Sequence, residues 1–130
     1  MRWLLALLVV LAWTVPVWAA GPVNPTTATA TLPQTNTDGS NLVDLAAINF
    51  CVGTSATGQL SQCVNVAVPS PDPAPSATVT TPVAAFSLTA EGQFFLDAEA
   101  VDQMGTTSQR STRVPFERRV APSPPTVTVQ

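Results

Sequence analysis

The sequence contains no histidine, no lysine and no tyrosine. Without histidine there is no Ser-His-Asp triad, no Cys-His pair and no imidazole ligand for a metal. Without lysine there is no Schiff-base chemistry and no P-loop lysine. Carboxylate pairs remain possible in principle. The composition therefore predicts a protein that is not an enzyme, with no metal and no cofactor.

Tryptophan occurs only near the N-terminus, in a segment whose composition differs from that of the rest of the chain. Arg2 precedes an unbroken apolar run, Trp3 to Trp13, and small residues follow. This is the pattern of a secretory signal peptide, with cleavage expected after Ala19. An uncleaved anchor is the alternative, but a span needs ~20 apolar residues and Pro16 interrupts the end of the run. We expect residues 1–19 to be removed and the protein to be secreted, periplasmic or at the cell surface.

The chain left after cleavage is mildly acidic. Its four arginines stand against eight acidic residues, a formal charge of −4. This balance favours solubility and argues against nucleic acid or an anionic membrane as the partner.

Apolar residues in the rest of the chain alternate with polar ones, which is typical of half-buried strands. Without crossover helices the strands must be antiparallel, and two sheets must pack face to face to bury their apolar sides. We predict an all-β, two-sheet antiparallel β-sandwich over residues 20–119, with a proline-containing tail over 120–130. About seven strands are expected, at 27–32, 48–52, 63–68, 77–81, 85–88, 93–101 and 107–116, with an exposed proline-rich loop at 69–76.

Two stretches, 33–55 and 92–108, resemble fibronectin type III-like modules of bacterial secreted and phage proteins. The first, from Pro-Gln-Thr-Asn-Thr-Asp-Gly-Ser to Cys-Val-Gly-Thr-Ser, is similar to the family's B–C loop and strand C. The second contains paired aromatics, Ala-Val-Asp and a glycine turn, as in strand F. Departures are Ala30 in place of a strand B tryptophan, Ile48 and Phe94 in place of tyrosines, and an insertion at Pro69–Thr81. The resemblance implies an immunoglobulin-like sandwich that serves as a spacer, an adhesion or ligand-binding unit, or an accessory domain.

Cys51 and Cys63 are the only cysteines. In an exported protein a single pair suggests a disulfide, which here would join two neighbouring strands. A loop of this size predicts about 3 kcal/mol of stabilisation. Free thiols or a redox couple are the alternative, although the spacing is not C-x-x-C.

A candidate binding loop contains the oxygen-bearing residues Asn36, Asp38, Asn41 and Asp44. These oxygens would suit calcium, but the segment fails the EF-hand pattern, because aligning Gly39 with position 6 leaves Leu45 at position 12. Asn, Asp and Gly are also what an ordinary turn requires. We therefore predict no metal site and treat the loop as a turn that a partner could contact.

The positive charges lie near one end of the chain, at Arg110, Arg113, Arg118 and Arg119. On a regular strand Arg110 and Arg113 point to opposite faces, and Asp97 and Glu99 face water. We expect the arginines to pair with Asp97, Glu99 or Glu117, or to be solvated. A site for an acidic glycan is the alternative.

The function expected from these features is a small exported binding or adhesion module with an unknown extracellular protein or glycan as partner. A structural spacer or a component of a cell-surface or virion assembly is the alternative. Thr126 to Val129 alternates like a strand, so self-association by strand addition at the tail is a further hypothesis. A protease inhibitor would need a protruding loop, for which Pro69–Thr81 is the candidate.

Overall fold

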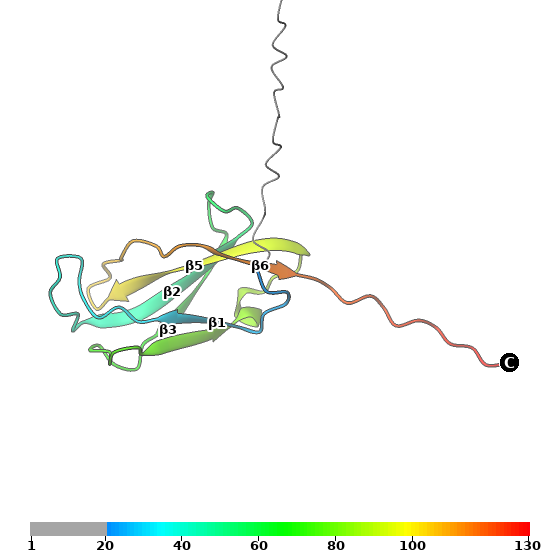
Figure 1. Cartoon of the computed structure of the whole chain (residues 1–130), viewed down its shortest axis with the longest axis horizontal. Helices are drawn as coiled ribbons and strands as arrows, with labels where there is room; N and C mark the ends of the chain where they lie inside the picture. The colour runs from blue at the N-terminus through cyan, green and yellow to red at the C-terminus, as the bar shows by residue number, and fades with distance from the viewer. Residues whose placement is uncertain (1–20) are drawn as a thin grey trace, which may run out of the picture.

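The computed structural model describes residues 21–130 and shows two antiparallel sheets (Figure 1). The predicted all-β sandwich is confirmed. The predicted signal peptide, residues 1–19, lies outside the described residues. No helix within residues 21–130 is long and apolar enough to cross a membrane.

The larger sheet has four strands in the order β3-β2-β5-β6. They are β2 (Leu45–Gly53), β3 (Gln62–Ala67), β5 (Gly92–Asp102) and β6 (Val114–Arg118). Apolar residues alternate along them, so that one face of the sheet presents a row of aliphatic and aromatic side chains. Ile48, Phe50 and Val52 of β2 lie on that inner face and are almost completely buried.

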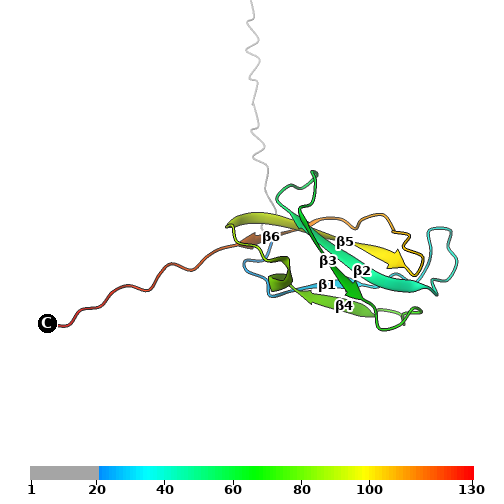
Figure 2. The same cartoon turned by 180° about the vertical axis from the view of Figure 1, so that it is seen from behind.

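The smaller sheet has two strands, β1 (Thr27–Thr31) and β4 (Thr78–Pro82), which pair from Thr27 opposite Pro82 to Thr31 opposite Thr78. Figure 2 shows these two strands lying below the four-stranded sheet. Threonines alternate with Ala28 and Ala30 along β1, and the alanines pack against the core. The short side chains make this layer thin.

The core between the sheets is closed by phenylalanines. Phe94 of β5 and Phe116 of β6 stack with ring centroids 5.5 Å apart. Phe86 comes from a 3-10 helix, η1 (Val83–Phe86), and is 1% exposed. Because the described residues contain no Trp or Tyr, these phenylalanines provide the large buried surfaces that aromatic residues give a sandwich.

Two predicted strands differ from the structure. The segment Ala85–Leu88 begins inside η1 and forms no strand, because Ser87 ends the helix in the left-handed conformation and turns the chain. The last strand was expected over 107–116, but regular pairing begins only at Val114. Residues 107–113 follow the edge of β5 as an irregular segment instead.

The first described residues lie along β6. Val23 pairs with Glu117 in a parallel bridge, and the Asn24 N–H donates to the Glu117 carbonyl at 2.7 Å. Glycine is required at position 21, since a Cβ there would lie 1.8 Å from the Pro115 carbonyl oxygen. This segment therefore covers the outer edge of β6.

Candidate functional site

Three connecting segments meet at one end of the sandwich, which we call the loop end: residues 33–44, 68–77 and 103–107. The Gln34 side-chain amide donates to the Ala74 carbonyl at 2.9 Å, which joins the first segment to the second. The Gln103 N–H donates to the Asp44 carbonyl at 2.8 Å, which joins the third to the first. Figure 1 shows all three at the end opposite to the C-terminal tail.

The first segment is a tight turn built by its own polar groups. The Gly39 N–H donates to the Asn36 carbonyl, and the Asn36 N–H donates to the Ser40 carbonyl. Gly39 has a φ of 83°, a left-handed conformation that glycine adopts without strain. Asn36, Asp38 and Asn41 are thus brought together, with the Asn36 amide donating to the Asn41 carbonyl at 3.3 Å.

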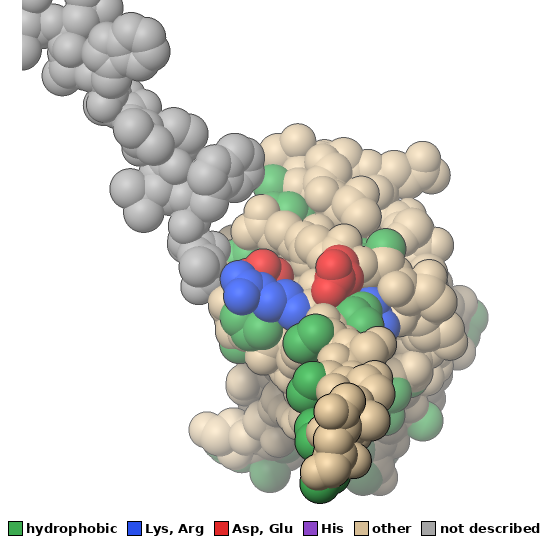
Figure 3. Space-filling model, turned by 90° about the vertical axis from the view of Figure 1, so that its right-hand side faces the viewer, with side chains coloured by type: hydrophobic (Ala, Val, Ile, Leu, Met, Phe, Trp, Pro, Cys, Tyr) green, Lys and Arg blue, Asp and Glu red, His purple; other side chains and the backbone are tan. Residues whose placement is uncertain are grey.

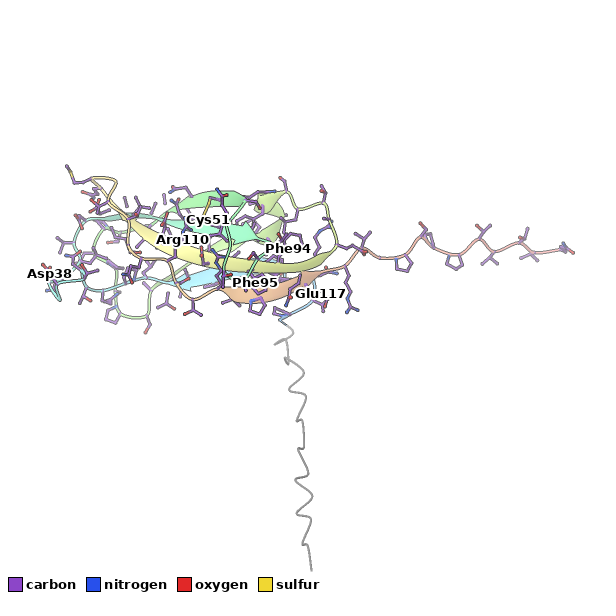
Figure 4. The ribbon with its side chains drawn as sticks, turned by 90° about the horizontal axis from the view of Figure 1, so that it is seen from above. Asp38, Cys51, Phe94, Phe95, Arg110 and Glu117 are labelled. Atoms are coloured by element: carbon purple, nitrogen blue, oxygen red, sulfur yellow. A yellow bond between two sulfur atoms is a disulfide. The ribbon has the colours of Figure 1, made fainter. Side chains whose placement is uncertain are left out.

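Asp38 stands at the tip of this turn, at the far end of the molecule from Glu117 (Figure 4). One of its carboxylate oxygens accepts bonds from the Ser40 hydroxyl at 2.6 Å and from the Ser40 N–H at 2.9 Å. These bonds stabilise the ionised form and lower the pKa of Asp38 below its usual 3.8. This carboxylate oxygen thus helps to hold the turn.

The fourth predicted residue, Asp44, is not part of that turn. It lies half-buried just before β2, and its carbonyl accepts the bond from Gln103. Within residues 21–130 no three acidic or cysteine side chains gather as they would around a metal ion.

Sequence reasoning missed two apolar residues at the loop end. Val43 is 62% exposed and Met104 is 87% exposed, and they flank the bond between Gln103 and Asp44. Met104 is held out by a turn in which one Asp102 carboxylate oxygen accepts from the N–H groups of Met104 and Thr106. The sequence did contain one indication: Met104 is an apolar residue within a polar turn, where no alternating strand pattern explains it.

A small open cavity lies between the first and third segments. It measures about 160 Å³ and is lined by side chains of the first and third segments, among them Asn36, Leu42 and Thr106. The loop end therefore offers two exposed apolar side chains, a rim of polar groups that includes the carboxylates of Asp38 and Asp102, and a shallow hollow.

The prediction that Asp97 faces water is wrong. Asp97 lies on the outer face of β5 but is only 2% exposed. Arg110 Nη1 lies 3.0 Å from one of its carboxylate oxygens and Arg113 Nε lies 3.4 Å from the other. Glu99 completes the cluster, 3.6 Å from Arg110. Because both oxygens of Asp97 bind guanidinium groups, this carboxylate is held in place as a structural anion.

The prediction that Arg110 and Arg113 point to opposite faces is also wrong. The Ser108 N–H donates to the Ala100 carbonyl and the Ser111 N–H donates to the Ala98 carbonyl. Three residues of this segment therefore span the length of two residues of β5, a bulged geometry. Residues spaced by three share a face under that geometry, so both arginines reach Asp97. The expected pairing with acidic residues is confirmed for Arg110, Arg113 and Arg119, the last with Glu117 at 2.9 Å. Arg118 instead donates to the backbone carbonyls of Thr89 and Ala90.

The predicted disulfide is present. Cys51 and Cys63 lie directly opposite each other on β2 and β3, with an S–S distance of 2.04 Å. Cys51 is completely buried on the outer face, where its other cross-strand neighbour is Asp97. Figure 4 shows Cys51 and Arg110 over the same part of the sheet.

A groove runs along the side of the sandwich between β1 and residues 108–116, which we call the edge groove. It consists of two cavities of about 440 and 210 Å³ that share Thr29, Leu96 and Val114 in their walls. Its floor is the inner face of the four-stranded sheet, including Ala98 and Ala100, which are half-buried. The two-stranded sheet is too narrow to cover this strip.

Comparisons with protein-family models, with curated proteins and with solved structures find no match to this chain.

Proposed function

We propose that this protein is a small exported, non-catalytic binding module of the fibronectin type III kind, and that it contacts a protein ligand through the loop end. The strand order β3-β2-β5-β6 packed against β1-β4 supports this assignment, because immunoglobulin-like sandwiches have their strands arranged in this way. Fold alone does not determine function, and support for binding comes from the surface of the loop end.

The observation that carries the proposal is the convergence of three distant segments at one end. Loops that a rigid sandwich holds together are a common position for ligand contacts. Here they present Val43 and Met104 to solvent among polar groups that include the carboxylates of Asp38 and Asp102. Methionine and aliphatic side chains surrounded by a polar rim suit contact with another protein. The three segments contain acidic but no basic side chains, so an anionic ligand finds no complementary charge there.

Export is supported by two independent features. The N-terminal sequence has the pattern of a cleavable signal peptide, and the Cys51–Cys63 disulfide belongs to the class of bonds that persist in oxidising compartments. Intact mass of the protein from the exported fraction, measured with and without reductant, tests both. We expect a chain that begins at Ala20 and gains about two hydrogens on reduction. A full-length mass would contradict the proposal.

The binding proposal is tested by photo-crosslinking on the exterior of the source cells. A benzophenone amino acid is introduced at Met104 in one variant and at Val120 in a matched control, since Val120 is also exposed but lies near the opposite end. We expect one discrete adduct from position 104 that disappears when Val43→Ser is added. Equal adducts from both positions, or none from position 104, would contradict the proposal.

The alternative role, a structural unit of an assembly, is favoured by a different observation, the open edge of β1 beside the edge groove. It requires self-association without any added ligand.

A further inference from the structure

Among residues 21–130, β1 has a hydrogen-bonded neighbour, β4, on one side only, so its other edge is open. The Leu32 N–H donates to the Ala77 carbonyl, and the Val83 N–H donates to the Thr26 carbonyl. In an antiparallel pair the bonded residues alternate. The backbone N–H and C=O groups of the even-numbered residues of β1 therefore point toward β4. The backbone N–H and C=O groups of Thr27, Thr29 and Thr31 point the other way, over the edge groove.

An edge of this kind is a template for another strand. Along β1 five residues are available, and the apolar floor of the groove lies beside them. An added strand would satisfy the free backbone groups and would bury the half-exposed side chains of Leu96, Ala98 and Ala100.

The C-terminal tail supplies such a segment. Bonds to Asn24 and Glu91 hold the chain to the body as far as Val120. Every residue from Ala121 to Gln130 is exposed, and the tail extends away from the sandwich (Figures 1 and 3). Val127 is 80% exposed and Val129 is 90% exposed, although both are strand-forming, apolar residues. All three prolines of the tail precede Thr126, so residues 126–130 keep every N–H donor.

We propose that residues 126–130 of one copy add to β1 of a second copy, antiparallel, and fill its edge groove. In one register the backbone hydrogen bonds can form and the apolar side chains of the tail also lie on the inner face. It places Thr126, Thr128 and Gln130 of the donor opposite Thr31, Thr29 and Thr27 of the acceptor, whose backbone groups are free. Val127 and Val129 then lie opposite Ala30 and Ala28, on the inner face over the groove. The small alanines leave space that the valines occupy.

The direction of the chain explains why the acceptor is a second copy. β1 runs toward the loop end, whereas the tail leaves the opposite end of the same molecule (Figure 1). A tail that folded back into its own groove would run parallel to β1, after a reversal at Pro122–Pro125. Those prolines favour an extended chain instead. An antiparallel donor strand enters at the loop end of the acceptor, so the copies join head to tail in an open chain.

Sedimentation velocity and light scattering over a wide concentration range test this proposal on the purified protein. Wild type should form a concentration-dependent ladder of oligomers. Val127→Asp with Val129→Asp should remain monomeric, and each single change should weaken association about tenfold, as expected for leaving one aliphatic side chain in water. A monomeric wild type, or a ladder unchanged in the double variant, would overturn the proposal.

The acceptor edge is tested by Thr29→Pro, which removes a free N–H from β1. Thr80→Pro is the matched control, since Thr80 lies directly opposite Thr29 and its backbone groups point to the other edge. Thr29→Pro should abolish the ladder, and Thr80→Pro should not. Neither Thr29→Pro nor the double valine variant should associate alone, but their mixture should form one-to-one dimers and nothing larger.

A peptide with the sequence of residues 125–130 provides a test that does not depend on folding of the proline variant. It should bind to the double valine variant and should add backbone amide protection at Thr27, Thr29 and Thr31 in hydrogen exchange. Absence of binding, or protection on β3 instead, would sink the assignment of the groove. The double valine variant should keep any crosslink formed at Met104, so failure of this proposal is distinguishable from failure of the binding proposal.

Discussion

The two sheets of this sandwich are stabilised to very different degrees. β2 has a strand on each side, and both of its faces are covered: the inner face by the core and the outer face by the disulfide and the Asp97 cluster. Within the part of the chain that the structure describes, β1 has one neighbour, and its outward threonines are exposed. The same short chain thus contains a rigid sheet and a marginal one.

The difference follows from side-chain size and from cross-links. Leu45–Gly53 has no residue more than half-exposed, whereas β1 contributes only Ala28 and Ala30 to the core from its five positions. Hydrophobic stabilisation scales with the apolar area removed from water, so β1 gains little from its packing. A strand held so weakly on one side is also the strand with an edge open to a partner.

The largest expected effect is the loss of a core side chain from the rigid sheet. Phe50→Ala should reduce the free energy of unfolding by about 3–5 kcal/mol, because Phe50 is 1% exposed. Val79→Ala on β4 truncates a smaller buried side chain of the marginal sheet and should cost about 1.5 kcal/mol. Urea unfolding followed by far-UV circular dichroism measures both. Equal losses would remove the contrast between the sheets.

Next comes the buried anion. Arg110→Ala combined with Arg113→Ala leaves the carboxylate of Asp97 buried without a partner, which should cost about 3–5 kcal/mol. Adding Asp97→Asn should recover part of that loss, since the uncharged amide tolerates burial better. Arg119→Ala, which removes a solvent-exposed pair with Glu117, is the control and should cause no measurable change. A large effect from Arg119→Ala would contradict this explanation.

The disulfide follows in size. Cys51→Ala with Cys63→Ala should cost about 3 kcal/mol, given the separation of 12 residues between the cysteines. Without the disulfide, the amide exchange rates of the four-stranded sheet should rise toward those of the two-stranded sheet. The increase should be largest in the β2–β3 hairpin. Reductant should lower the unfolding midpoint of wild type but not of the double variant. An effect of reductant on both would show that another process is being measured.

The smallest effect concerns the turn at Asp38. The bonds from Ser40 lower the pKa of Asp38 in the folded state. The stability that these bonds add to the fold is therefore fully present above the ordinary carboxyl pKa. It is lost as the pH falls through the lowered pKa. NMR of the Ser40 amide should show a titration with a midpoint below 3.8, the ordinary value for an aspartate. Asp38→Asn should abolish that titration while leaving the amides of β2 unchanged.

The sequence predicted the sheets better than it predicted their edges. Alternation identified the inner faces of β2 and β5 correctly, because burial on one face imposes a period of two. The disulfide was predicted correctly because export and a spacing other than C-x-x-C both favour a structural bond between the two cysteines. The bulged segment 107–113 could not be found in this way, since its bonding depends on Ser108 and Ser111 meeting β5 out of phase. The burial of Asp97 was missed for the same reason.

The loop end was predicted only in part. Asn36, Asp38 and Asn41 were recognised as one turn from local composition, which acts over a few residues. The contacts of Gln34 with Ala74 and of Asp44 with Gln103 join segments at least 40 residues apart. No local pattern encodes such contacts, because they depend on where the sheets bring the loops.

The parallel bridge between Val23 and Glu117 has a mechanical consequence. The two segments run in the same direction, so opposite pulls on Gly21 and Val120 slide them past each other. Three bonds then carry the load together: Asn24 N–H to the Glu117 carbonyl, Glu117 N–H to the Pro22 carbonyl, and Arg119 N–H to the Asn24 side chain. Bonds loaded in shear must break at once, whereas bonds that are unzipped break one after another. Tension applied at the two ends of this domain is therefore resisted first by this short clamp, before either sheet is strained.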